Sequence, residues 1–388
     1  MKKSLRIIFL ATMIVFLFAL PLAWSAQAAQ SDDTGKLFGE AAKPKRGSVV
    51  SVRISAADQQ KALRMWTHEA IAAAPAMEMP AMAGPAEVDA SVLSSAQVVT
   101  NEPSGMVAGS APDATADQVA QAAFAEDWAV LEQTVAEELV DDTTGTPGVY
   151  TAYTANWVAA MQTIYPHRWI GRVSFSTSGG TSYCSGTALR GNVMLTAAHC
   201  LYDTTNNVWY SNWVFTPAYR NGSAPYGSFP ATTCWVLTAW VNLAGAYNIN
   251  TWAPYDVGVC RMGNNAAGQT LNTAVGSMGY GWGASYIRHV HNLGYPFRDY
   301  NNNLLSNAGL YLRTCAAETF QQAAEVRGMG CYYGGGISGG PWMTGYAPGV
   351  VSGYAHGVNS GIFIGSQNIY GARFNNTNIV PLCSAAGC

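Results

Sequence analysis

The chain has 388 residues, of which 49% are hydrophobic and only 11% are charged, and its formal net charge is −3 at pH 7. We expect no nucleic-acid partner for a chain of this composition.

The N-terminal residues have the pattern of a secretory signal peptide. Three basic residues precede an apolar run over 7–22, and Ala26 and Ala28 follow it at the spacing of a cleavage site. A retained membrane anchor is the alternative, but the run contains Pro21 and is short for a membrane-spanning helix, which favours the signal peptide. We expect residues 1–28 to be a signal peptide and the mature protein to be secreted, extracellular and not bound to the membrane.

Residues 29–147 differ in composition from the rest of the chain. Positions 29–145 hold 18 acidic and 7 basic residues, a net charge of −11, and no cysteine. Residues 73–85 are rich in Ala, Met and Pro, which is typical of a linker. The apolar positions of 116–140 recur at spacings of three and four, which predicts an amphipathic helix. We expect this block to be partly helical or disordered.

Residues 148–388 have the composition of a different domain. Positions 146–388 contain 10 Arg, no Lys, 5 acidic residues, all 8 cysteines and 33 of the 40 glycines. Short apolar runs such as 169–175 and 193–195 are bounded by turn residues, which favours an all-β domain. About 240 residues is large for one core but ordinary for two barrels.

The eight cysteines indicate disulfides, because the chain carries a signal peptide pattern and the extracellular space is oxidising. The sequence alone does not determine their connectivity. We favour sequential neighbours, which gives the pairs Cys184–Cys200, Cys234–Cys260, Cys315–Cys331 and Cys383–Cys388.

Three short motifs carry the chemistry of this domain. His199 lies in Thr-Ala-Ala-His-Cys, Asp256 in Tyr-Asp-Val-Gly-Val, and Ser338 in Gly-Ile-Ser-Gly-Gly-Pro. A serine hydroxyl needs a base to take its proton, and the base needs a carboxylate to orient it. The reaction also needs backbone N–H donors for the developing oxyanion, which the N–H groups of Gly336 and Ser338 can supply.

Asp256 is the best candidate for the carboxylate. Asp203 follows His199 too closely to turn back on the imidazole ring, and the other three acidic residues of the domain lie in polar segments. Asp256 stands in a buried-strand pattern, where a carboxylate is costly unless it is hydrogen-bonded. The alternative is a structural Asp that holds a turn after Pro254.

Ser338 also fits a second motif, the nucleophile elbow G-x-S-x-G of esterases and lipases, with Gly336 and Gly340 as its glycines. That fold requires an acidic residue and then a histidine after the serine. No Asp or Glu follows Glu325, so the chain order excludes the elbow.

The three motifs and their order resemble those of the chymotrypsin-fold (trypsin-like) serine peptidases. Runs at 165–171, 213–227 and 294–296 resemble more particularly the secreted microbial glutamyl-endopeptidase-like branch. The resemblance implies two six-stranded antiparallel β-barrels with the active site between them. His199 and Asp256 would come from the first barrel and Ser338 from the second, and the chemistry would need no metal and no cofactor.

The chain departs from the trypsin-like pattern at Ile337. In trypsin-like enzymes an Asp at this position pairs with the new N-terminus on activation, which Ile337 cannot do. We therefore expect residues 29–147 to be an acidic pro-region that aids folding or covers the cleft of a catalytic domain over 148–388, with cleavage between about 137 and 157. Their opposite net charges would favour docking, and a solvated acidic spacer is the alternative.

Substrate preference is suggested by two features near the serine. No acidic residue lies between Glu325 and Ser338, which disfavours a preference for Arg or Lys. In glutamyl endopeptidases a histidine after the nucleophile binds the substrate carboxylate, and His356 lies at a comparable distance past Ser338. A surface or core histidine is the alternative for His356.

His289 and His291 form an H-x-H motif whose side chains would face the same side of a strand, as two metal ligands can. No third ligand of Cys or carboxylate type is evident in the sequence, so we expect no metal site.

The sequence therefore predicts a secreted, monomeric serine endopeptidase that hydrolyses protein or peptide substrates through an acyl-enzyme. It would interact with its own pro-region in the proform and could prefer Glu or Asp before the cleaved bond. The alternatives are a catalytically silent binding protein on the same fold and an esterase-like serine hydrolase.

Overall fold

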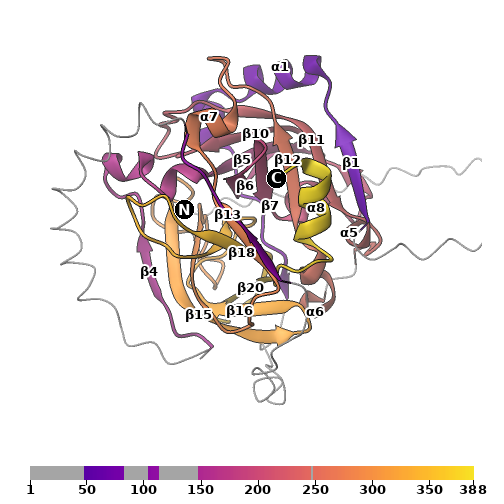
Figure 1. The fold of residues 1–388 in the computed structure, drawn as a ribbon, viewed down its shortest axis with the longest axis vertical. Helices are drawn as coiled ribbons and strands as arrows, with labels where there is room; N and C mark the ends of the chain where they lie inside the picture. Colours follow the sequence, from indigo (N-terminus) through magenta and orange to yellow (C-terminus); the bar gives the residue numbers. More distant parts are fainter. Residues whose placement is uncertain (1–47, 83–103, 113–146, 246–247) are drawn as a thin grey trace, which may run out of the picture. The chain divides into compact units, whose positions relative to one another are not determined.

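The described part of this computed structural model comprises four stretches of chain, namely residues 48–82, 104–112, 147–245 and 248–388 (Figure 1). All of them belong to one compact unit. The predicted signal peptide over 1–28 and the predicted helix over 116–140 lie outside the described residues. No helix in the described stretches is long and apolar enough to cross a lipid bilayer.

Six antiparallel strands close into a first barrel. Their order is β10-β5-β6-β7-β12-β11, and the ring closes because β11 pairs with both β10 and β12. The strands are rich in β-branched and aromatic residues, and inward side chains such as Val173, Phe175 and Leu195 have no solvent exposure. The six strands are β5 (Ile170–Thr177), β6 (Gly180–Leu189), β7 (Val193–Thr196), β10 (Ser211–Pro217), β11 (Phe229–Leu237) and β12 (Gly258–Met262).

A second sheet contains another ring of six strands, in the order β20-β16-β15-β14-β17-β18. The backbone N–H of Ser360 donates to the Tyr370 carbonyl at 2.9 Å, and that of Phe374 donates to the His356 carbonyl at 3.2 Å. These two bonds join the ends of the ring. The strands are β14 (His289–Gly294), β15 (Arg313–Ala323), β16 (Val326–Gly330), β17 (Pro341–Thr344), β18 (Tyr354–Val358) and β20 (Asn368–Ala372). The predicted all-β class with two barrels is confirmed.

Short elements extend this second sheet at its margins. The strand β13 (Gly279–Trp282) pairs with β18, and β19 (Gly361–Phe363) pairs with β20. The strand β4 (Thr151–Thr154) pairs with β15. A separate two-stranded ribbon is formed by β8 (Tyr202–Asp203) and β9 (Val208–Trp209).

Parts of the N-terminal block are paired with the two barrels. The strand β1 (Val49–Arg53) pairs with β11, β2 (Ala81–Met82) with β19, and β3 (Gly105–Val107) with β13. The helices α1 (Ala56–Met65) and α2 (His68–Ala73) follow β1 in the chain. Between them Trp66 is 3% exposed, and its Nε1–H donates to the Asn212 carbonyl at 2.7 Å.

The linker prediction for residues 73–85 is wrong over 74–82. Met79 is only 4% exposed, and Ala81 and Met82 form a strand with the second sheet. Ala and Pro do not favour strands, and here pairing with residues that are distant in sequence determines the conformation of the segment.

The remaining helices are short and connect or cover the barrels. They are α5 (Thr238–Val241), α6 (Ile249–Trp252), α7 (Leu271–Val275) and α8 (Ile379–Ala386). After leaving the second barrel, the chain returns in α8 to the first, where Arg261 of β12 donates from Nη2 to the Ala386 carbonyl at 2.6 Å.

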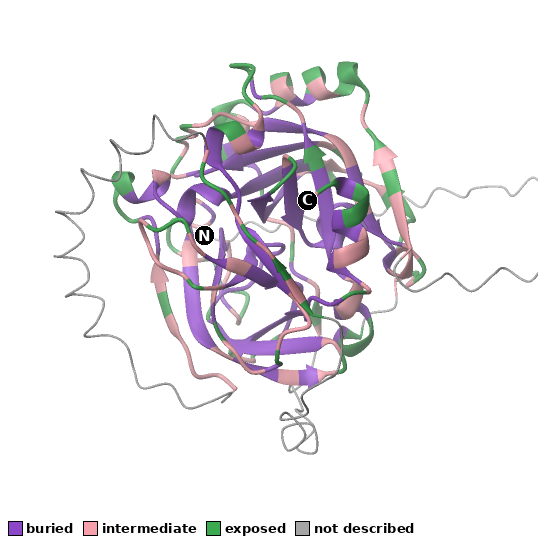
Figure 2. Cartoon of the chain, in the orientation of Figure 1, coloured by how far each residue is buried: buried purple, intermediate pink, exposed green. Residues whose placement is uncertain are grey.

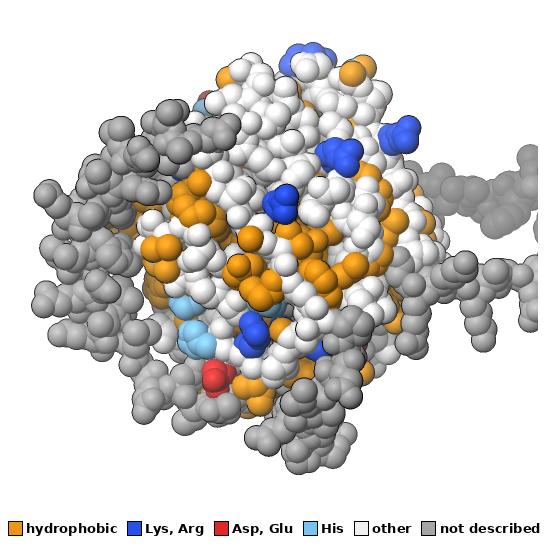
Figure 3. All heavy atoms as spheres, viewed as in Figure 1, with side chains coloured by type: hydrophobic (Ala, Val, Ile, Leu, Met, Phe, Trp, Pro, Cys, Tyr) orange, Lys and Arg blue, Asp and Glu red, His pale blue; other side chains and the backbone are white. Residues whose placement is uncertain are grey.

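The strands of both barrels are largely buried, whereas α1 is exposed on its outer side (Figure 2). On the face that carries β3 and β13, apolar side chains gather and charged ones are isolated (Figure 3). This agrees with the low fraction of charged residues in the sequence, which is 11%.

Candidate active site

The first barrel brings His199 and Asp256 together through its strand register. His199 lies just beyond β7, in a single 3-10 turn over Ala198–Cys200. The strand β7 pairs with β12 so that Thr196 stands opposite Gly258. Asp256 precedes Gly258 by two residues and therefore lies beside the turn that carries His199.

Asp256 accepts two hydrogen bonds from His199. The backbone N–H of His199 donates to Oδ1 of Asp256 at 2.8 Å, and the ring Nδ1 lies 2.7 Å from Oδ2. Asp256 has no solvent exposure and His199 is 8% exposed. A buried carboxylate holds a proton donor close, so Nδ1 carries the ring proton and Nε2 is the atom that can accept another.

Ser338 lies in the loop that leads into β17, and Ser185 of β6 anchors this loop to the first barrel. The backbone N–H of Ser185 donates to the Ser338 carbonyl at 2.8 Å. The hydroxyl of Ser185 donates to the Gly336 carbonyl at 2.9 Å and accepts from the backbone N–H of Tyr295 at 2.8 Å. Ile337, which precedes the serine, is buried in an apolar cluster of the second barrel.

Gly339 brings the serine loop against the histidine turn. Its φ is +80°, and a Cβ added there would lie 2.1 Å from Oγ1 of Thr196 and 2.7 Å from the backbone nitrogen of Ala197. Only glycine permits so close an approach. Within the described part of the chain, neither Oγ of Ser338 nor Nε2 of His199 has a hydrogen-bond partner, although both are buried.

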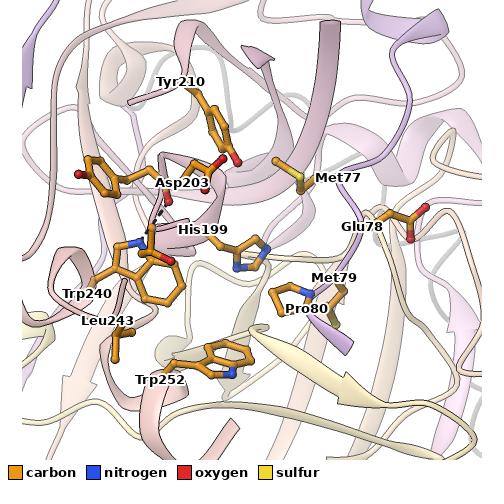
Figure 4. A pocket seen from close by; sticks show the side chains of 12 residues that line it. Met77, Glu78, Met79, Pro80, His199, Asp203, Tyr210, Trp240, Leu243 and Trp252 are labelled. Carbon is orange, nitrogen blue, oxygen red and sulfur yellow. Dashed lines mark hydrogen bonds between the residues drawn. The ribbon is translucent and has the colours of Figure 1, made fainter. Parts of the chain in front are cut away.

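A pocket opens beside His199. Its walls come from the first barrel and from the N-terminal block, and Figure 4 shows the imidazole ring pointing toward Met79 and Pro80. The residues on the other sides include Tyr202, Asp203, Tyr210, Trp240 and Trp252.

All eight cysteines form disulfides, in the four pairs that the sequence analysis favours: Cys184–Cys200, Cys234–Cys260, Cys315–Cys331 and Cys383–Cys388. The first pair ties the turn that carries His199 to strand β6. His199 is thereby held on one side by a covalent bond and on the other by Asp256.

Three of the carboxylates that the sequence analysis set aside have structural partners. Asp203 accepts from the backbone N–H of Thr205 at 2.8 Å and so holds a turn. Asp299 accepts from the backbone N–H of Asn303 at 2.7 Å. Glu325 pairs with Arg373 at 2.9 Å.

His356 lies elsewhere, on β18, and is not among the residues that line the pocket beside His199. It is 2% exposed, and its Nε2 lies 3.3 Å from Nη1 of Arg288. Burial, together with the charges of Arg288 and Arg327, lowers the pKa of His356 to about 3. Its predicted role in binding a substrate carboxylate stays a prediction.

The rings of His289 and His291 lie side by side on β14, with centroids 5.4 Å apart. The ring of His291 stacks on Tyr346 at 4.3 Å. The one group of potential metal ligands within 4.8 Å of one another in the described stretches consists of His199 and the two cysteines of the first disulfide. A disulfide offers no thiolate, so this group does not fit a metal ion.

The part that residues 74–82 play in this site is not evident from the sequence. Alternation of apolar and polar residues in Met77-Glu78-Met79 was the one signal that could have indicated a strand there.

The structure has two β-barrels. A histidine–aspartate pair lies at the edge of the first, and a serine loop of the second packs against it. This is the arrangement that the resemblance to the chymotrypsin-fold serine peptidases implies. No protein-family model matches the chain. The chain is 29% identical over 125 residues to the glutamyl endopeptidase of Bacillus licheniformis, a match that covers 32% of this chain and 34% of that protein. It thus spans about a third of the length of this curated relative. The relative confirms the resemblance that the motifs indicate.

Several solved structures are also similar. The protease Anisep from Arthrobacter nicotinovorans is 30% identical over 57% of this chain and 96% of that one, with a TM-score of 0.48. A Glu endopeptidase is 16% identical over 62% of this chain and 99% of that one, with a TM-score of 0.47.

Proposed function

We propose that this chain is a secreted serine endopeptidase that cleaves peptide bonds through Ser338, His199 and Asp256. The observation that carries the proposal is the doubly hydrogen-bonded pair of His199 and Asp256, at 2.8 and 2.7 Å, with the Ser338 loop packed against it. A binding protein on the same fold would have no physical need for this arrangement.

In the proposed reaction, Oγ of Ser338 attacks the peptide carbonyl while Nε2 of His199 takes the hydroxyl proton. Asp256 holds the ring in the tautomer that this step requires and stabilises the imidazolium that forms. The N–H groups of Gly336 and Ser338 would donate to the oxyanion, and each such donor is worth about 2.7–4 kcal/mol of barrier.

The protonated His199 then gives its proton to the leaving amine, which departs and leaves an acyl-enzyme on Ser338. A water molecule enters, gives a proton to His199 and attacks the ester carbonyl. The second tetrahedral intermediate collapses to release the carboxylic acid and restore the serine.

The proposal extends to a preference for Glu or Asp before the cleaved bond. It is supported by the name of the curated relative and by the charge of the catalytic region, which contains 10 Arg and only 5 acidic residues. Cleavage of a peptide library would test it: cuts after Glu or Asp that are lost in His356→Ala, while cuts after Ala or Leu persist, would support His356 as the ligand. Cuts after Lys or Arg alone would contradict the preference.

The N-terminal block is proposed to be a pro-region that is removed between about 137 and 157. Direct sequencing of the N-terminus of active protein from culture medium would test this. A start near Ala29 on fully active protein would contradict it.

The activity itself is tested with purified wild type and Ser338→Ala on a panel of peptides and on an ester substrate. We expect the wild type to cleave peptides and the variant to lose about 10⁶-fold in kcat. Equal rates for the two proteins would show that Ser338 is not the nucleophile, and cleavage of the ester alone would favour an esterase.

A further inference from the structure

A segment of the N-terminal block, residues 74–82, passes beside His199 and forms one wall of the pocket there. Met77, Met79 and Pro80 form part of the pocket wall, and Figure 4 shows them beside the imidazole ring. In the proposed reaction a peptide substrate would have to lie beside the same imidazole ring, because Nε2 of His199 takes the proton of Ser338.

The first end of the segment is bound to the first barrel. The backbone N–H of Tyr183 donates to the Pro75 carbonyl at 2.9 Å, and the N–H of Met77 donates to the Tyr183 carbonyl at 2.8 Å. Arg172, which is 1% exposed, donates from Nη2 to the Ala74 carbonyl at 3.2 Å. The segment thus lies beside β6 and pairs with it in parallel at one position, Ala76 opposite Tyr183.

The other end is bound to the second barrel. The backbone N–H of Ile362 donates to the Pro80 carbonyl at 3.1 Å, and that of Ile364 donates to the Met82 carbonyl at 3.0 Å. Here too the pairing is parallel, between β2 and β19. Because its two ends belong to different barrels, the segment crosses the region between them where the active site lies.

The middle of the segment contacts the serine loop directly. The backbone N–H of Gly336, one of the two proposed oxyanion donors, donates to the Met77 carbonyl at 3.1 Å. Met79 is 4% exposed and belongs to the apolar cluster of the second barrel that includes Tyr333 and Ile337. Glu78 between them pairs with Arg298 at 3.1 Å.

We propose that residues 74–82 are a built-in inhibitor of this active site. The segment occupies the substrate cleft as an extended strand, places a carbonyl on an oxyanion donor, and inserts Met79 into an apolar pocket beside the serine loop. This inference rests on the proposed function and specifies its regulation. It follows that a free peptide with the sequence of 74–82 (Ala-Pro-Ala-Met-Glu-Met-Pro-Ala-Met) binds the same cleft whenever the chain's own segment has left it.

The first experiment measures how fast a fluorophosphonate probe labels the intact full-length chain, with the chain length checked by mass spectrometry. Met79→Asp would place a charge in the apolar pocket, and Met77→Pro would remove the N–H that bonds Tyr183. Met79→Asp should be labelled at least about tenfold faster than the wild type, because burial of one large apolar side chain is worth that factor or more. Met77→Pro should also be labelled faster, because it loses the hydrogen bond that holds the segment to Tyr183. Met106→Asp is the matched control, since Met106 is 59% exposed on β3, and it should be labelled like the wild type. Labelling of the wild type as fast as both variants would overturn the inference.

The second experiment does not depend on activity or self-processing, because it uses full-length chains that carry Ser338→Ala. Fluorescence anisotropy measures binding of a dye-labelled 74–82 peptide, with a scrambled peptide as control. The peptide should bind at least about tenfold more tightly to Ser338→Ala/Met79→Asp than to Ser338→Ala alone. Equal binding to the two chains, or no binding to the double variant, would overturn the inference.

The two experiments separate this inference from the proposed function. Selective peptide binding without labelling of any full-length variant would support the occupied cleft and contradict the serine peptidase. Serine-dependent labelling at equal rates in wild type and variants would support the peptidase and contradict the inhibitor.

Discussion

Asp256 binds His199 at two points, the backbone N–H at 2.8 Å and the ring Nδ1 at 2.7 Å, so that one buried carboxylate holds both the position and the orientation of the imidazole. Asp256→Asn would keep the shape, but its amide oxygen would accept from the backbone N–H of His199 and its amide N–H₂ would face Nδ1. The ring would then favour the wrong tautomer.

We expect Asp256→Asn to lower kcat by about 10⁴-fold, with a much smaller change in KM. Steady-state kinetics on a peptide substrate, with circular dichroism to show that the variant is folded, would measure this. A loss of less than tenfold in the folded variant would contradict the role of Asp256.

Gly339 maintains the contact between the two loops of the site. In Gly339→Ala the new Cβ would lie 2.1 Å from Oγ1 of Thr196, so the serine loop must move away from the histidine turn. A displacement of about 1 Å costs on the order of 10²-fold in rate. Gly349→Ala is the matched control, because Gly349 has a similar φ of +82° but nothing within 4 Å of its added Cβ.

Both glycine variants should lose about 1–2 kcal/mol of stability, because alanine is strained in the left-handed backbone conformation. Only Gly339→Ala should also lose catalytic rate. Comparable kcat values for the two variants would show that the close approach at Gly339 does not position the serine.

Stability should fall as the solution becomes acidic. Burial lowers the pKa of His167 to about 4, and its ring nitrogens lie 2.8 Å from the Met161 carbonyl and 2.8 Å from the hydroxyl of Tyr346. The unfolded chain therefore takes up a proton near pH 6.5 that the folded chain resists until about pH 4. The stability contributed by neutral His167 is complete above pH 6.5 and is lost as the pH falls toward 4.

At pH 5 this loss amounts to about 2 kcal/mol relative to neutral pH for His167 alone. Unfolding by denaturant at the two pH values, on Ser338→Ala to prevent self-digestion, would measure it. His167→Gln in the same background should reduce the difference by about that amount. An unchanged difference would mean that other groups cause the acid sensitivity.

The disulfide between Cys184 and Cys200 should matter for both stability and activity. It closes a loop of sequence separation 16 and holds the turn that carries His199. Replacing both cysteines by Ala should cost about 3 kcal/mol of unfolding free energy in the chain-entropy model, and kcat should fall as well.

Replacing Cys383 and Cys388 is the control for this prediction, because that pair closes a separation of only 5. It should cost less stability and leave kcat unchanged. Denaturant unfolding would measure the loss of stability in both variants, and steady-state kinetics would measure the loss of kcat. An equal loss of kcat in the two variants would contradict a local effect of the first disulfide on His199.

The residues that pair in and around the site could be predicted from the sequence where a short stretch of chain carries the pattern. Asp256 stands out because a carboxylate in an apolar strand pattern asks for a hydrogen-bond donor, and the register of β7 and β12 places His199 there. The four disulfides join cysteines that are neighbours along the chain. In each case a short-range pattern and the chemistry of one residue type favoured the pairing that the structure contains.

Features that depend on distant pairing could not be predicted in this way. The segment 74–82 finds its partners near Tyr183, Gly336 and Ile362, far along the chain, and its own composition suggests a linker. Likewise, the distance between Ser338 and His356 in sequence does not show where His356 points. The structure places His356 on β18, where its Nε2 lies 3.3 Å from Nη1 of Arg288 and it does not line the pocket beside His199.

The central claim is that Ser338 is the nucleophile. It is tested most directly by labelling active protein with a fluorophosphonate and locating the modified residue by mass spectrometry of its peptides. We predict a single adduct on Ser338, formed at a rate that falls strongly in His199→Ala. An adduct on another serine, or no adduct on protein that cleaves peptides, would contradict the account.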